Sequence, residues 1–166
     1  MPADPLASRV LSALVGRGQT LATAESITGG LIGAALTSVP GASAAYRGGL
    51  VTYATDLKHS LGRVQQEVLD EAGVISERTA RAMAAGVREA TGADWGLAVT
   101  GVAGPDPQEG HAAGEVWIGV SGPGLSGIAQ QLELAGGRDA VREQTVAAAL
   151  GLLASVLAGA ENSTRG

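Results

Sequence analysis

The chain has 166 residues, no cysteine and a formal net charge of −5, from 11 basic and 16 acidic side chains. This length suits one domain with a substantial core. Without cysteine there is no disulfide, thiolate zinc site or cysteine nucleophile, so a serine, threonine or lysine must carry any covalent chemistry. The acidic balance and the lack of a basic cluster argue against a nucleic-acid partner.

Hydropathy gives no sign of export or of a membrane partner. Charges interrupt the apolar positions near the N-terminus, unlike a signal peptide, and no apolar stretch reaches the ~18 residues of a membrane span. We therefore expect a cytoplasmic protein. Apolar residues make up 45% of the chain but aromatic residues only 2%, which predicts a core of Ala, Val, Leu and Ile.

The first half of the chain alternates helical and extended patterns. Apolar residues at helical spacing predict a helix over 5–15 that ends at Gly16 and Gly18. Asp56 is expected to cap a following helical piece, and Gly62 and Gly73 are expected to end such pieces. In order after the first helix come a strand over 20–24, a helix over 29–39, a loop over 40–43, a strand over 48–54 and short helices within 56–73.

The second half contains most of the predicted sheet. Ser76 begins a predicted helix over 76–91, which Gly92 ends. Strands are predicted over 95–100, 115–121 and 128–134, followed by a broadly apolar helix over 138–157. This order predicts an α/β fold, a three-layer α/β/α sandwich with a mixed, mostly parallel sheet. We expect one domain over residues 1–159 and a disordered tail over 160–166.

The first predicted strand stops abruptly at polar residues and a glycine pair. Glu25, Ser26 and Thr28 precede Gly29 and Gly30 at the mouth of a predicted helix, where free backbone N–H groups attract anions. A serine placed there is either a nucleophile beside a developing negative charge or an N-cap for the helix. From this segment alone the two interpretations stay open.

Two further glycine-bearing segments are candidate ligand sites. One is Gly48-Gly49, and the other is the TGVAGP turn from Thr100 to Pro105. Its glycines allow a ligand to approach the backbone, although an ordinary turn uses them too. Neither segment matches a Walker A loop or a dinucleotide fingerprint, so ATP and NAD are not indicated.

A tyrosine and a lysine follow the second predicted strand. Tyr53 and Lys58 stand in the segment YATDLK. Lysine acts as a general base only when burial or a nearby cation lowers its pKa, and otherwise Lys58 is an ordinary surface residue. The two histidines, His59 and His111, lie in polar surroundings that support neither a Ser-His-Asp triad nor a metal site.

Three segments in this order resemble the CinA C-terminal family, which includes the bacterial nicotinamide mononucleotide amidases. They are TAESITGGLIGAALTSVPGASAAYRGGLVTYATDLKHSLG, then TGVAGP with the following EVWIGV, then GGRDAVREQTV. The resemblance covers nearly the whole chain. It implies hydrolysis of the carboxamide of nicotinamide mononucleotide to nicotinic acid mononucleotide and ammonia in pyridine nucleotide salvage, without a metal or redox cofactor.

The resemblance also implies roles for individual residues. Ser26 is the expected nucleophile, Lys58 the expected base, and Tyr53 a group that orients the lysine or relays a proton. Expected substrate contacts are Glu25, Thr28, Gly29, Gly30, Gly48, Gly49, Thr100, Gly101, Gly104 and Pro105. Arg47, Arg138 and Arg142 are candidates for pairing with the phosphate, Arg138 above all.

One loop departs from the family pattern. After GVAGP the chain reads DPQEGHAAGE, where a glycine pair and a lysine-proline step are common in the family. This difference leaves an alternative function, a non-catalytic nucleotide-binding module of the CinA type. Larger members carry a separate N-terminal domain, so the chain resembles the stand-alone form, and the broad apolar surface of its last helix leads us to expect a homodimer.

Overall fold

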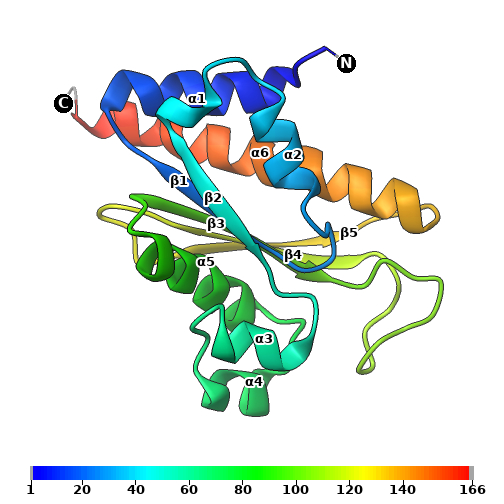
Figure 1. The fold of residues 1–166 in the computed structure, drawn as a ribbon. Coiled ribbons are helices and arrows are strands. Elements are labelled where there is room, and N and C mark those ends of the chain that lie inside the picture. Colours follow the sequence, from blue (N-terminus) through cyan, green and yellow to red (C-terminus); the bar gives the residue numbers. More distant parts are fainter. Residues whose placement is uncertain (1, 165–166) are drawn as a thin grey trace.

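A five-stranded sheet lies between two layers of helices (Figure 1) in the computed structural model, which describes residues 2–164. The strand order is β2-β1-β3-β4-β5. β1 pairs in parallel with both β2 and β3, whereas β3, β4 and β5 form an antiparallel meander. Only β4 therefore runs against the other strands. The strands are β1 (Leu21–Glu25), β2 (Tyr46–Val51), β3 (Trp95–Gly101), β4 (Glu115–Ser121) and β5 (Ile128–Glu133).

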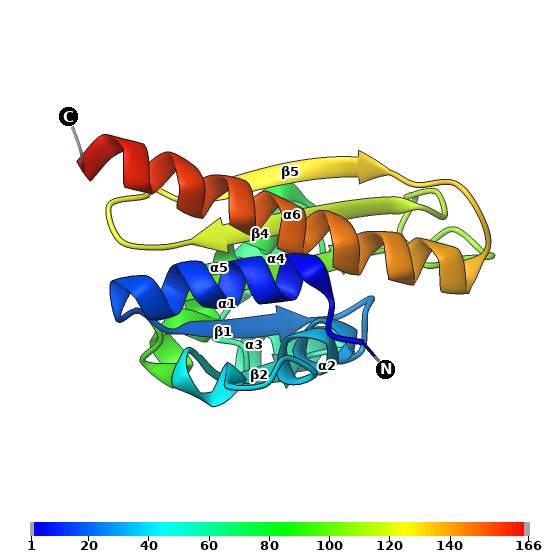
Figure 2. The same cartoon turned by 90° about the horizontal axis from the view of Figure 1, so that it is seen from above.

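Helices cover both faces of the sheet, as the two views at right angles show (Figures 1 and 2). One layer holds α1 (Pro5–Arg17), α2 (Leu31–Thr37) and α6 (Arg138–Thr164). The other holds α3 (Thr55–Ser60), α4 (Gln66–Ala72) and α5 (Glu77–Thr91). A short 3₁₀ helix, η1 (Ala42–Ala44), precedes β2. The predicted α/β sandwich with a mixed sheet is confirmed.

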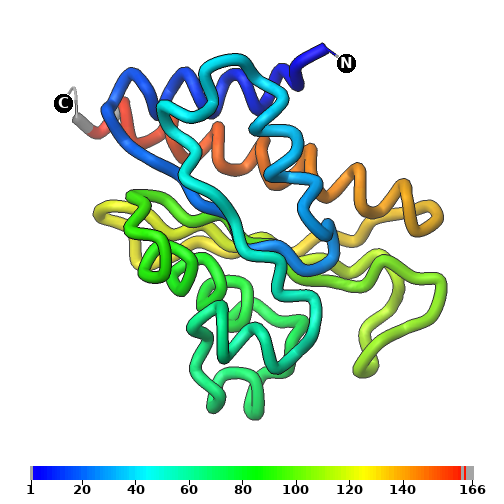
Figure 3. The backbone as a smooth tube through the Cα atoms, in the orientation of Figure 1, coloured from blue at the N-terminus to red at the C-terminus, as the bar shows by residue number. Residues whose placement is uncertain are grey.

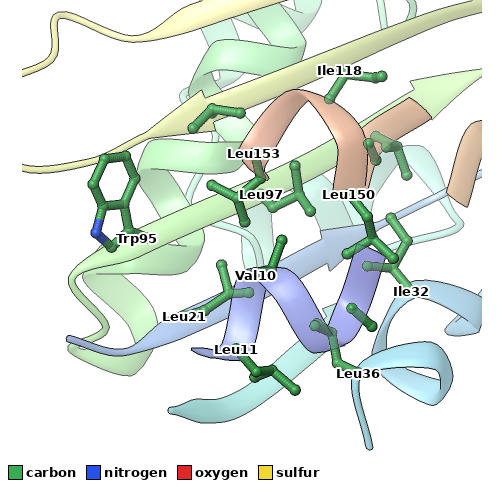
Figure 4. Packing of buried hydrophobic residues seen from close by; sticks show 14 of the residues in the cluster. Val10, Leu11, Leu21, Ile32, Leu36, Trp95, Leu97, Ile118, Leu150 and Leu153 are labelled. Carbon is green, nitrogen blue, oxygen red and sulfur yellow. The ribbon is translucent and has the colours of Figure 1, made fainter. Parts of the chain in front are cut away.

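Each face of the sheet has its own aliphatic core. Leu97 of β3 packs with Val10 of α1 and Leu150 of α6 on one face (Figure 4). On the other face, Ala98 of β3 packs with Met83 and Val87 of α5. Neighbouring residues of β3 thus serve opposite cores, because successive side chains of a strand point to opposite faces. This double burial explains why β3 reads as a continuous apolar run.

Glycines allow α5 to lie directly on the sheet. A Cβ on Gly96 of β3 would stand 2.1 Å from the carbonyl oxygen of Ala84, and one on Gly119 of β4 would stand 2.1 Å from that of Ala80. These distances are far below van der Waals contact, so only glycine permits the observed approach of the helix backbone.

Several predicted boundaries differ from the structure for local reasons. α2 begins at Leu31 because Gly29 and Gly30 adopt positive φ angles of 59° and 107°. Asp56 is not the cap of α3, whose N-cap is Ala54, and instead lies in the first turn. The predicted start and end of α5 are confirmed, since Ser76 Oγ accepts from Thr79 N and Gly92 ends the helix with a φ of 70°.

The last helix is longer than predicted. α6 continues to Thr164, so residues 160–164 are helical rather than a disordered tail, and 165–166 lie outside the described residues. Within residues 2–164, α6 alone is long and apolar enough to span a membrane by length and composition, which the sequence analysis did not foresee. Its buried Leu150, Leu153 and Leu157 pack in the core on this face of the sheet, although only 33% of the apolar window is buried in the single chain.

Candidate active site

Ser26 follows the last residue of β1 and is 8% exposed. Its backbone N–H donates to the carbonyl of Val99 on β3 at 3.2 Å, which extends the sheet pairing by one residue. The chain then turns sharply through residues 26–30 before α2 starts. Because the carboxyl ends of parallel strands meet at one edge of a sheet, this turn lies where ligands of α/β proteins bind.

Lys58 of α3 is buried beside this turn, with only 2% of the residue exposed. Its Nζ donates to Ser26 Oγ at 3.1 Å and to the carbonyl oxygen of Thr52 at 2.7 Å. The carbonyl oxygen of Tyr53 lies 3.5 Å away. Backbone carbonyls just beyond β2 therefore hold the amine against the serine hydroxyl.

Burial lowers the pKa of Lys58 to about 8, and the Glu109 carboxylate opposes this shift more weakly. A lysine with that pKa has a usable neutral fraction near neutral pH, which an exposed lysine lacks. The sequence alone left Lys58 either a base or a surface residue. The structure places it as a buried neighbour of Ser26.

Glu25 holds the start of α2 rather than facing the pocket. Its carboxylate accepts from Thr28 Oγ1 at 2.6 Å and from the backbone N–H groups of Ile32 at 2.8 Å and Gly33 at 3.0 Å. The carboxylate thus neutralises the positive end of the helix from inside the protein. We had expected Glu25 to contact substrate, but its oxygens are already bonded within the chain.

A pocket of about 430 Å³ opens in front of Ser26 and Lys58. Thr100, Gly101, Gly104 and Pro105, which the resemblance gives as substrate contacts, form one wall of it. Thr100 Oγ1 donates to the carbonyl of Val74 at 2.7 Å, which ties this wall to the segment before α5. Lining residues that sequence reasoning missed are Ile27, Thr55, Val74, Ile75, Val102, Ala103, Asp106, Pro107 and Gln108.

Arg138 and Tyr53 lie together at the rim of the pocket. Arg138, the first residue of α6, donates to the carbonyl of Gly104 at 2.9 Å and to the Tyr53 hydroxyl at 3.2 Å. Tyr53 is 62% exposed. The phenol of Tyr53 contacts Arg138, whereas the backbone carbonyl of Tyr53 is the group that lies near Lys58 Nζ.

Other predicted residues lie outside the pocket. Gly48 and Gly49 stand within β2 rather than at a turn, and neither lines the pocket. Arg47 binds the carbonyl of Thr91 at 2.9 Å. Thr28, Gly29 and Gly30 belong to the turn after Ser26 but do not line the pocket. Gly48 and Gly49, a candidate ligand site in the sequence, are thus part of the sheet.

The loop of residues 102–114 extends beyond the sheet (Figure 3), and its part from Asp106 to Gly114 is the segment expected to depart from the family pattern. At its tip Gln108 and His111 exchange two backbone hydrogen bonds of 3.0 and 2.8 Å. His111 Nδ1 lies 2.6 Å from the carboxylate of Glu115. His59 Nδ1 lies 2.7 Å from the carbonyl of Val64. Among the described residues no group of three or more His, Asp or Glu side chains is arranged to hold a metal ion.

The fold and the site together define an α/β protein with a buried serine–lysine pair facing a pocket at the edge of its sheet. The chain belongs to the CinA C-terminal domain family, whose sequence pattern matches residues 3–157.

Full-length relatives extend well beyond this domain. The chain is 51% identical over 160 residues to a CinA-like protein of Frankia casuarinae, covering 96% of this chain and 37% of the relative. It is 45% identical over 154 residues to a putative competence-damage inducible protein of Levilactobacillus brevis, covering 93% and 37%. The chain thus spans about 37% of the length of these curated relatives.

Solved structures match over almost their whole length. Competence damage-inducible protein A of Klebsiella pneumoniae superposes with a TM-score of 0.88 at 36% identity, covering 92% of this chain and 95% of that one. The competence/damage inducible protein CihA of Agrobacterium tumefaciens gives 0.87 at 34% identity, covering 93% and 98%. These names describe competence and damage induction and state no reaction.

Proposed function

We propose that this domain hydrolyses the carboxamide of nicotinamide mononucleotide, giving nicotinic acid mononucleotide and ammonia in pyridine nucleotide salvage. The observation that carries the proposal is the 3.1 Å contact between Lys58 Nζ and Ser26 Oγ at the pocket, with the pKa of Lys58 lowered to about 8. A nucleophile within hydrogen-bond reach of a base is the arrangement that acyl transfer requires.

The reaction follows from this pair. Neutral Lys58 takes the proton from Ser26 Oγ as the oxygen bonds to the amide carbon. The resulting ammonium then gives that proton to the amide nitrogen, the C–N bond breaks and ammonia leaves. In the second step Lys58 takes a proton from water as the water oxygen bonds to the acyl carbon. The ammonium returns that proton to Ser26 Oγ as the bond from this oxygen to the acyl carbon breaks, which releases the acid. This chemistry consumes water alone and needs no cofactor.

Charge distribution supports binding of the phosphate at the rim by Arg138. The N-terminus of α2, the other attractive place for an anion, is filled by the carboxylate of Glu25. Arg138 already lies at the pocket, held by the carbonyl of Gly104. Arginine matches phosphate geometry with two parallel hydrogen bonds. The carboxamide then lies at Ser26 and the phosphate at Arg138.

Ammonia release from nicotinamide mononucleotide tests the proposal. Ser26→Ala should abolish release, whereas the control Ser60→Ala, which changes an exposed serine of α3, should leave it unchanged. Activity retained by Ser26→Ala would contradict the serine mechanism. Binding of the nucleotide without ammonia release by the wild type would instead indicate a non-catalytic nucleotide-binding module.

Two further expectations belong to this proposal. A salvage enzyme works where its nucleotide is present, so we propose a cytoplasmic location.

We also propose a homodimer through α6, whose Val146, Leu152 and Val156 are only partly buried in the single chain. Sedimentation of the wild type beside Leu152→Glu tests the dimer, since a charge at a buried interface should dissociate it.

A further inference from the structure

Arg142 of α6 binds the turn that carries the nucleophile. Its Nε donates to the carbonyl of Ile27 at 3.1 Å and its terminal nitrogen to the carbonyl of Thr28 at 3.3 Å. The side chain is half-buried between α6 and the turn. Two successive carbonyls after Ser26 are thus held by one guanidinium group, whose planar fork fixes their direction.

The direction of these carbonyls determines the direction of the neighbouring amides. In a trans peptide the carbonyl of one residue and the N–H of the next point in opposite directions. The carbonyl of Ile27 faces Arg142, so the N–H of Thr28 points away from α6. The carbonyl of Ser26 accepts from Gly29 N at 3.1 Å, so the N–H of Ile27 points away from that bond.

These two amides have no acceptor within residues 2–164. Backbone bonds of the turn use the N–H groups of Gly29 and Leu31, and Glu25 takes those of Ile32 and Gly33, but no acceptor meets the N–H of Ile27 or Thr28. Both residues are buried, and of the two only Ile27 lines the pocket. Buried backbone donors are almost always paired, so the unpaired donor of Ile27, which follows the nucleophile and lines the pocket, indicates an acceptor that arrives with a ligand.

We propose that Arg142 is a positioning residue. It holds the Thr28 carbonyl, and the N–H of the same peptide, on Gly29, holds the Ser26 carbonyl, so that the amide of Ile27 forms an oxyanion hole for the adduct on Ser26. When Ser26 Oγ bonds to the amide carbon, the electron pair of the carbonyl moves to its oxygen, and the N–H of Ile27 donates to that oxygen. The N–H of the residue that follows a serine nucleophile commonly serves this purpose. The inference deepens the proposed amidase function and rests on it.

This role differs from direct binding of the phosphate, for which Arg142 was a sequence candidate. A phosphate contact would be lost equally from the ground state and the transition state, and only with a phosphorylated substrate. An oxyanion hole acts only while the tetrahedral adduct exists. The two roles therefore predict different changes in kcat and KM.

The experiment compares Arg142→Met and Arg142→Lys on nicotinamide mononucleotide and on the riboside that lacks the phosphate. Arg142→Met should lower kcat by ~10²–10³ on both substrates with little change in KM. Arg142→Lys should recover part of the loss, since its amine can donate to a carbonyl. The control Arg81→Met, which changes a surface arginine paired with Glu77 on α5, should behave as the wild type.

The kinetic constants of the Arg142 variants decide whether Arg142 positions the turn. A rise in KM for the mononucleotide alone, or unchanged kinetics, would overturn the positioning role. If Arg142→Met does not fold, as judged by circular dichroism, Arg142→Lys carries the comparison, and a kcat equal to that of the wild type would refute the inference.

A wild type that releases no ammonia would refute the proposed function separately. Binding of pyridine-3-boronic acid, which forms a tetrahedral adduct with a serine hydroxyl, then tests the oxyanion hole. The folded Arg142 variants should bind it at least about tenfold more weakly than the wild type, and equal binding would overturn the inference.

Discussion

Lys58 Nζ lies 3.1 Å from Ser26 Oγ, although the two residues are 32 positions apart in the chain. The parallel pairing of β1 and β2 brings them together, because Ser26 follows β1 and Lys58 lies in the helix after β2. Strand order at this edge of the sheet thus creates the contact on which the proposed chemistry depends.

The protonation of Lys58 predicts a pH dependence. Below a pKa of about 8 the amine is charged and cannot accept the serine proton, and above it the neutral form dominates. We expect kcat/KM to rise with pH through a midpoint near 8 and then level off. Initial rates of ammonia release between pH 6 and 10 measure this midpoint. A profile that is still rising steeply at pH 10 would mean that Lys58 titrates like an exposed lysine.

Tyr53→Phe tests whether the phenol relays protons or only supports Arg138. The hydroxyl accepts from Arg138, and a hydrogen bond of this kind contributes about 1 kcal/mol. We expect KM for the mononucleotide to rise by no more than about tenfold, with kcat nearly unchanged. Steady-state kinetics provide both constants. A fall in kcat of a hundredfold or more would indicate that the Tyr53 hydroxyl relays protons.

Glu25→Ala should act through stability rather than through substrate binding. It removes the carboxylate that caps α2 and leaves Ile32 N, Gly33 N and Thr28 Oγ1 without their acceptor. A lost helix cap costs up to about 2 kcal/mol, and this cap accepts three bonds. Urea denaturation should therefore show a loss of about 2 kcal/mol or more. Full stability with a raised KM would instead support a contact between Glu25 and the substrate.

Gly49→Ala should destabilise the edge of the sheet. A Cβ there would stand 2.3 Å from Thr23 Oγ1 and 2.8 Å from the Tyr46 hydroxyl, which themselves share a 2.7 Å hydrogen bond. Overpacking of this kind costs about 1–3 kcal/mol.

Gly151→Ala is the matched control for this glycine. Gly151 lies in α6 with nothing within 4 Å of an added Cβ. Alanine there should keep or raise the melting temperature, because it favours a helix over glycine by up to about 1 kcal/mol. Equal melting temperatures for the two variants would mean that β2 adjusts freely around residue 49.

Periodicity and turn residues predicted most of the fold, because each helix has an apolar face and a distinct end. Ser76 and Gly92 delimit α5 as expected. The predicted end of α6 was wrong. The small residues after Leu157 are typical of a disordered C-terminus, but the helix continues to Thr164. Alanine suits a helix whereas glycine, asparagine and serine favour turns, so the mixed composition after Leu157 does not separate a helix from a loop.

The site was predictable only in part. Ser26 and the turn from Thr100 to Pro105 were candidates because polar and glycine residues follow apolar strands, and the family resemblance gave them roles. Both line the pocket, and their roles stay predictions. The substrate contact expected of Glu25 stays a prediction, because a carboxylate before a helix suits a cap and a ligand contact equally, and the structure shows the cap. Sequence also gave no sign that Arg142 binds the carbonyls after Ser26, since such bonds depend on where α6 crosses the turn.

The site draws on both faces of the sheet, with Lys58 from the layer of α3 and the two arginines from the first turns of α6. Fraying of that end of α6 would release Arg138 and Arg142 together while the contact of Lys58 with Ser26 persists. Helix ends open at a smaller free energy than the whole domain. Loss of activity in mild denaturant would then report this local opening, ahead of global unfolding seen by the backbone signal.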